Sequence, residues 1–233
     1  MNRRFTTSPL AALIPLFLLG GCITGGLYGE RDVALMASRY EELERIGERE
    51  IAGLKEVPSP KLMPLCMAYS KLKRYNKLFP CLDRLEDNIR RGDKRQMDFD
   101  EFTKRNPLMA GLAMMGSAVA GGREGLEGDI SIFPFLMRAE AYIDLARYPE
   151  AVEQAKQAVA NIPTQWWSQE HWARIQATSM LGLAYALGGD RENALKTATE
   201  LENVSKGVGL AKIHLALKNY PKALDAMEQN KDN

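Results

Sequence analysis

The feature that most constrains the fold of this sequence is a pattern of small and aromatic residues that occurs three times in its second half. The pattern is a small residue, a tyrosine three positions later and an alanine nine positions after that. The third copy has histidine in place of tyrosine. The three copies are Ala139, Tyr142 and Ala151, then Gly182, Tyr185 and Ala194, then Ala211, His214 and Ala223. In each copy a turn sequence separates two stretches with helical apolar spacing, which predicts three pairs of helices.

These residues resemble the tetratricopeptide repeat, a helix-turn-helix unit in which small residues let two helices pack closely and a proline closes the unit. The resemblance implies an all-α fold, an α-solenoid of antiparallel helix pairs over residues 136–233, in which each pair buries its apolar side against the next. It assigns to packing Ala139, Tyr142, Tyr148, Ala151, Ala158, Pro163, Gly182, Tyr185, Ala194, Ala211, Tyr220 and Ala223.

The copies are not separated by the 34 residues that are usual for this repeat. Gly182 follows Ala139 by 43 residues, so about nine residues are inserted, and we expect them within residues 164–172. Ala211 follows Gly182 by only 29 residues, so about five are missing there. Regular stacking is therefore in question at both junctions.

The first 22 residues have the order of a secretory signal. Arg3 and Arg4 precede an apolar run over residues 10–19, which is shorter than the roughly 20 residues that span a bilayer, and Leu19-Gly20-Gly21-Cys22 follows. This order resembles the bacterial lipobox, in which the cysteine is linked to diacylglycerol and becomes the new N-terminus. The resemblance implies a lipoprotein signal peptide at residues 1–21 and an acylated Cys22.

The resemblance also implies a bacterial envelope protein. No aspartate follows Cys22, which favours the outer membrane, facing the periplasm, and the Gly-rich residues 22–31 are predicted to be a lipid-anchored flexible spacer. Of the 31 basic side chains, Arg3 and Arg4 fall in the removed segment, which leaves 29 against 30 acidic side chains. We therefore expect no binding to nucleic acid.

Residues 32–105 are predicted to hold the N-terminal helices. One amphipathic helix is expected from 32 to about 55, and a degenerate copy of the repeat follows, with Cys66 at the small position and Leu78 in place of alanine. On this alignment Cys66 and Cys81 lie on two antiparallel helices, which would bring them within the Cα distance of a disulfide bond. In an oxidising periplasm they are a disulfide candidate, and burial as two small apolar residues is the alternative.

Residues 106–135 form a separate region. Its first part, 106–122, is apolar and rich in glycine and methionine, and a Gly-rich stretch that reads as a flexible loop follows. The apolar part is either a buried helix or an exposed surface that a partner or the membrane covers.

Trp166, Trp167 and Trp172 fall within the expected insertion. They either contact a partner protein, since tryptophan is enriched in interface hot spots, or cover the apolar end of a neighbouring helix.

The sequence contains no arrangement of residues that is typical of an enzyme active site. His171 and His214 are its only histidines, they lie far apart in sequence, and neither has the spacing of a zinc site. A phosphate-binding Gly-rich loop and a nucleophile elbow are also missing from the sequence. We expect no catalytic residues, no metal and no cofactor.

The expected function is therefore protein binding, as a membrane-anchored scaffold or assembly factor for an envelope complex, through a partner that the sequence does not identify. Two alternatives remain open. One is a binder of a small hydrophobic ligand or a transporter accessory protein. The other is the N-terminal repeat module of a larger enzyme or sensor.

Overall fold

The structure, a computed structural model, describes residues 30–95, 104, 129–162, 167–205 and 207–228 of the 233-residue chain. Its helices are α2 (Glu30–Met36), α3 (Tyr40–Ile51), α4 (Ser59–Lys71), α5 (Tyr75–Arg90), α9 (Phe133–Asp144), α10 (Tyr148–Ala160), α11 (Trp167–Leu187), α12 (Arg191–Glu202), α13 (Val208–Ala216) and α14 (Tyr220–Glu228). The only β-pairing in these ranges is an isolated bridge between Arg95 and Asp129. The predicted all-α class is thus confirmed for the residues described.

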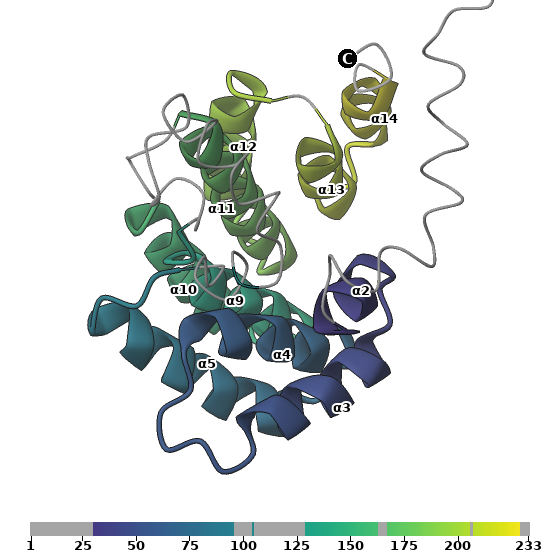
Figure 1. Cartoon of the computed structure of the whole chain (residues 1–233). Coiled ribbons are helices and arrows are strands. Elements are labelled where there is room, and N and C mark those ends of the chain that lie inside the picture. The colour runs from purple at the N-terminus through teal and green to yellow at the C-terminus, as the bar shows by residue number, and fades with distance from the viewer. Residues whose placement is uncertain (1–29, 96–103, 105–128, 163–166, 206, 229–233) are drawn as a thin grey trace, which may run out of the picture.

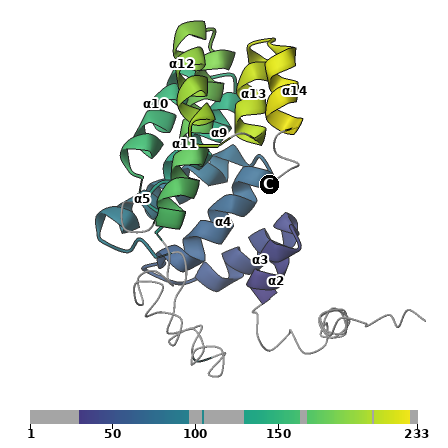
Figure 2. The same cartoon turned by 90° about the horizontal axis from the view of Figure 1, so that it is seen from above.

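Consecutive helices form antiparallel pairs, which we call hairpins I (α2–α3), II (α4–α5), III (α9–α10), IV (α11–α12) and V (α13–α14). The second helix of each hairpin packs against the first helix of the next, and from α4 onward the first helices also contact one another. Figures 1 and 2 show a curved row that runs from α2 to α14, with hairpin V on the same side of the molecule as α2.

The five hairpins share one three-residue turn. Its middle residue has a positive φ of 54° to 57° in four hairpins, where it is Ser38, Lys73, Ala146 or Lys218, and of 84° at Gly189 in hairpin IV. The next backbone N–H donates to the carbonyl five residues earlier, over 2.8 to 3.0 Å in all five. This bond satisfies a carbonyl that the end of the first helix would otherwise leave without a partner.

The shared turn sets a common register. The residue five positions after the middle turn residue is buried in every hairpin; these residues are Leu43, Leu78, Ala151, Ala194 and Ala223. Alanine or leucine at this position lets the second helix lie close against the first. The alanine positions of the sequence pattern are therefore buried packing positions, and the small residues Ala139, Gly182 and Ala211 are buried as well.

Hairpin I corrects one expectation. The sequence predicts a single helix over residues 32–55, but the chain turns back at Ser38, and α2 and α3 are two antiparallel helices. Ion pairs between Arg31 and Glu50 and between Arg49 and Glu30 join them. The apolar spacing alone did not reveal the turn, because serine at a left-handed position is not a strong turn signal.

The insertion between hairpins III and IV lies in a helix rather than in a linker. Helix α11 has 21 residues and α9 has 12, so α11 is longer by the nine residues that the spacing predicted. The inserted residues extend the first helix of hairpin IV at its N-terminal end. Helix α13 has only nine residues, which accounts for part of the shorter spacing between Gly182 and Ala211.

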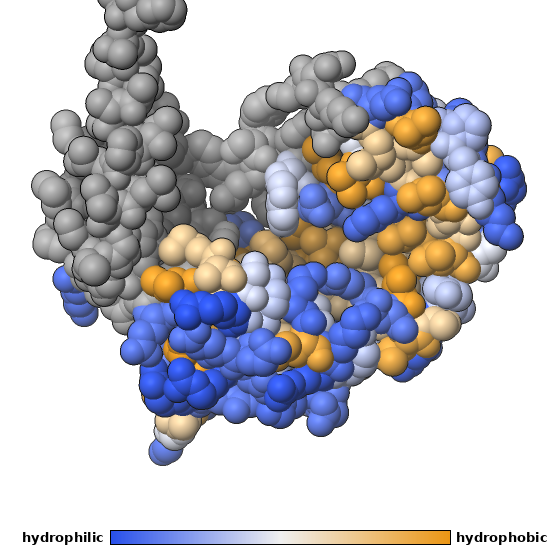
Figure 3. Space-filling view, turned by 90° about the vertical axis from the view of Figure 1, so that its right-hand side faces the viewer, coloured by the Kyte–Doolittle hydropathy of each residue, from blue (hydrophilic) through white to orange (hydrophobic). Residues whose placement is uncertain are grey.

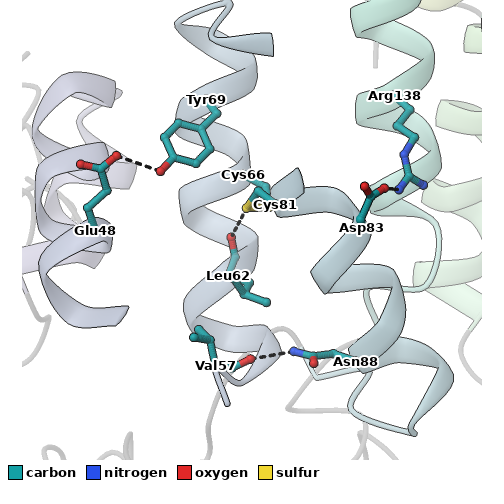
Figure 4. The surroundings of a disulfide bond; sticks show 9 residues. All are labelled: Glu48, Val57, Leu62, Cys66, Tyr69, Cys81, Asp83, Asn88 and Arg138. Carbon is teal, nitrogen blue, oxygen red and sulfur yellow. Dashed lines mark hydrogen bonds and ion pairs between the residues drawn. A yellow bond between two sulfur atoms is a disulfide. The ribbon is translucent and has the colours of Figure 1, made fainter. Parts of the chain in front are cut away.

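Hairpin II contains a disulfide bond between Cys66 of α4 and Cys81 of α5, whose Cα atoms are 5.7 Å apart (Figure 4). Both cysteines are buried in a core cluster that α4, α5 and α9 share. Near one end of this hairpin the Asn88 side chain donates a hydrogen bond of 2.7 Å to the carbonyl of Val57. The pair of cysteines that the sequence proposed is joined, and both are buried as well.

The shared turn leads to a prediction at Ala146. A residue with a side chain costs about 1 kcal/mol or more at a left-handed position, so Ala146→Gly should raise the free energy of unfolding by about 1 kcal/mol, measured by urea denaturation. The control is Ala160→Gly at the exposed end of α10, which should lower it by up to about 1 kcal/mol because glycine is a poor helix former. Equal effects of the two substitutions would contradict the role of the turn.

Candidate protein-docking surface

At each junction the second helix of one hairpin contacts an aromatic residue of the next, four positions before the middle turn residue. Glu48 of α3 accepts a hydrogen bond of 2.9 Å from the Tyr69 hydroxyl. Phe79 of α5 stacks on Tyr142 with ring centroids 5.3 Å apart. Lys156 of α10 lies 6.0 Å from the centroid of Tyr185. The same position of the first helix is therefore contacted at these junctions, by a residue ten positions after the middle turn residue at Glu48 and Lys156 and six positions after it at Phe79.

Charged side chains reinforce two of these junctions. Between hairpins I and II the nearly buried Glu44 carboxylate pairs with Arg74 at 2.7 Å and with Lys77 at 2.9 Å. Between hairpins II and III the buried Arg138 guanidinium pairs with Asp83 and Glu86 (Figure 4 shows the first pair). Burial, together with the bond to Glu48, raises the pKa of Tyr69 to about 12, so its hydroxyl remains a donor.

Hairpin V exposes to solvent several positions whose counterparts in earlier hairpins are buried. We define the C-terminal face as Val208, Leu215, Tyr220, Leu224 and Met227, which are 44% to 63% exposed. Three of them correspond to Met63, Ala186 and Ala198 of earlier hairpins, which are only 2% to 9% exposed. In Figure 3, hydrophobic side chains gather on the right-hand side of the view, from the upper part, where hairpin V lies, downward. The C-terminal face is therefore a stacking surface without a described hairpin on it.

The opposite end of the row has a different character. The outward side of α3 exposes Glu41, Arg45 and Arg49, and the lower part of Figure 3 is mostly hydrophilic. Repeat arrays need polar outer faces at their ends to remain soluble. Helix α3 gives hairpin I such a face, beside the exposed Met36 of α2, whereas the C-terminal face of hairpin V is apolar.

The structure places most of the predicted packing residues in helix contacts. Gly182 and the alanines at 139, 151, 158, 194, 211 and 223 are buried, whereas Tyr142, Tyr148 and Tyr185 are partly buried. The assignment of Tyr220 to packing is wrong, because its side chain is 63% exposed. The corresponding Tyr148 lies against the turn of hairpin IV, where a Cβ on Gly188 would be 3.2 Å from it, and no described hairpin follows Tyr220.

Trp172 is the only one of the three tryptophans whose side chain the structure describes. It is 45% exposed and stacks on Phe133 of α9 with ring centroids 5.6 Å apart. The Trp172 ring thus covers part of the neighbouring hairpin, and the rest of the ring is accessible to solvent. Cys22, Pro163, Trp166 and the apolar segment 106–122 lie outside the described residues.

His214 occupies the aromatic position of hairpin V and is buried. Its Nε2 lies 3.6 Å from the Glu202 carboxylate, too far for a hydrogen bond. Burial lowers the pKa of His214 below its usual value, and the Glu202 carboxylate acts in the opposite direction. The neutral imidazole therefore fills a packing position.

The described residues contain no group of three or more His, Cys, Asp or Glu side chains that could hold a metal ion. Within the same ranges, no helix has the length and apolar character needed to cross a membrane. Comparisons with models of known protein families, with curated proteins and with solved structures find no match to this chain.

The residues of the C-terminal face were not assigned from the sequence. A signal was present in the spacing of Tyr220, Leu224 and Met227, which recur at four and three residues and lie on one face of a helix. The residues that fill the interior of hairpin V are Ala223 and Ala226, on another side of α14. An apolar stripe beside a buried alanine stripe is a sign of a helix with two contact faces.

Proposed function

We propose that this chain is a lipid-anchored, tetratricopeptide-like α-solenoid of the bacterial envelope that binds other proteins, as a scaffold or assembly factor. The observation that carries this proposal is the row of hairpins with one shared turn and one register, which ends in an exposed apolar stacking face. Exposed apolar patches on a folded protein mark sites of interaction. Stacked helix pairs also provide an extended surface on which proteins dock.

Photocrosslinking in intact cells tests the protein-binding part of this proposal. A benzophenone amino acid replaces Leu224, Trp172 or Leu145 in turn, one residue per variant, and these three exposed residues lie in hairpins V, IV and III. We expect a discrete protein adduct from at least one position after irradiation, identified by mass spectrometry. The absence of a protein adduct at all three positions would argue against a scaffold.

The anchor leads to a separate prediction. Each buried CH₂ of an acyl chain contributes roughly 0.8 kcal/mol to membrane binding, so Cys22→Ser, which prevents acylation, should move the protein from the membrane fraction to the soluble fraction. Fractionation with immunoblotting measures this, and Leu224→Asp, which leaves Cys22 intact, should remain in the membrane fraction. A Cys22→Ser protein that stays with the membranes would show that the lipid is not the anchor.

A further inference from the structure

We propose that the C-terminal face docks an amphipathic helix of a partner protein, which presents an aromatic residue to Leu224 and a basic residue to Glu228. This inference rests on the proposed function and adds the chemical class of the docked segment. Hairpin V shows to solvent Leu224 and Glu228, and the residues at these two positions in hairpin II contact the next hairpin.

Leu224 corresponds to Phe79. Each lies six residues after the middle residue of its turn, and the Phe79 ring stacks on Tyr142 of the next hairpin. Leu224 is 61% exposed, so its apolar surface is open to a similar ring. An aromatic side chain on the docked helix would bury this surface.

Glu228 corresponds to Asp83. Each lies ten residues after the middle residue of its turn, and Asp83 pairs with Arg138 of the next hairpin. Glu228 is exposed and carries the same charge as Asp83. Arg138 and Tyr142 are four residues apart, which places both on one side of α9. The docked helix should therefore carry a basic residue one turn before its aromatic residue.

The size and charge of the two ends favour a partner helix over a second copy of this chain. Two nine-residue helices, each about 10 Å wide and about 13 Å long, offer a face on the order of 300 Å². A stable protein dimer buries about 800 Å² on each partner. Head-to-tail stacking would set the apolar C-terminal face against hairpin I, whose helix α3 exposes Glu41, Arg45 and Arg49. A single helix laid on an apolar surface is a common mode of peptide recognition.

The test uses helix α9 of this chain, because it carries a basic and an aromatic residue at the required spacing. The probe is a fluorescent peptide with the sequence of residues 131–147, which contains Arg138 and Tyr142, and the protein is the full chain. Fluorescence anisotropy should show saturable binding in the micromolar range. Leu224→Asp in the protein, or Tyr142→Ala in the peptide, should weaken binding at least tenfold. Glu228→Lys should weaken it severalfold.

The matched control is Leu145→Asp, which changes an exposed leucine in the turn of hairpin III and should leave binding unchanged. Circular dichroism of each variant should match that of the unchanged protein. Absence of peptide binding would overturn the inference. Binding that Leu224→Asp leaves unchanged would also overturn it, because the peptide would then have replaced the chain's own α9 on hairpin II.

Two combined outcomes separate this inference from the proposed function. A protein adduct at Leu224 in cells, together with no binding of the peptide, would support the scaffold and overturn the amphipathic helix as its ligand. Peptide binding that depends on Leu224, together with no adduct at any tested position, would support the docking chemistry and overturn the scaffold function.

Discussion

Loss of the disulfide bond between Cys66 and Cys81 is expected to lower the free energy of unfolding by about 3 kcal/mol, because the bond closes a loop of about 15 residues and restricts the unfolded chain. The two cysteines join α4 to α5 within the core cluster that hairpins II and III share. Urea denaturation with and without dithiothreitol measures the change, and the midpoint should fall to lower urea concentration.

The control for this prediction is the double variant Cys66→Ala and Cys81→Ala, which cannot form the bond. Its stability should be close to that of the reduced protein, and dithiothreitol should not change it further. A reductant effect of equal size on both proteins would come from somewhere other than this bond. An unchanged midpoint on reduction of the natural chain would show that hairpin II does not depend on the bond.

The sequence predicted hairpins II to V because each has clear turn or packing signals. Tyr148-Pro149 and Gly188-Gly189 mark two turns, and the small residues at 139, 182 and 211 mark close helix contacts. It also predicted the size of the insertion correctly. These features are local, since a turn and its two helices depend mainly on neighbouring residues, and local signals are the ones that a sequence shows most directly.

The features that sequence reasoning missed depend on contacts between distant residues. The turn at Ser38 is stabilised by ion pairs such as the one between Arg31 and Glu50, 19 residues apart. The placement of the inserted residues in α11 depends on packing of α11 against its neighbours. The residues of the C-terminal face could be assigned only by comparing the exposure of equivalent positions across hairpins. Each of these requires the arrangement of whole hairpins in space.

Close contact between hairpins IV and V gives the second large expected effect. Gly209 of α13 lies against α11, and a Cβ added to it would be 2.8 Å from the Cβ of Ser179 and closer still to its Oγ. Such overpacking costs typically 1–3 kcal/mol, and alanine recovers up to about 1 kcal/mol through helix propensity. We expect Gly209→Ala to lower the free energy of unfolding by about 2 kcal/mol, measured by urea denaturation.

The compensating variant is Ser179→Gly, which removes the atoms that the new Cβ would meet. The double variant should be more stable than the sum of the two single effects predicts, by about 1 kcal/mol or more, because contacting residues are energetically coupled. Since hairpin V carries the C-terminal face, Gly209→Ala should also weaken binding of the 131–147 peptide, and Ser179→Gly should restore part of it. Strictly additive effects on stability would mean that α13 does not pack on α11 through these two residues.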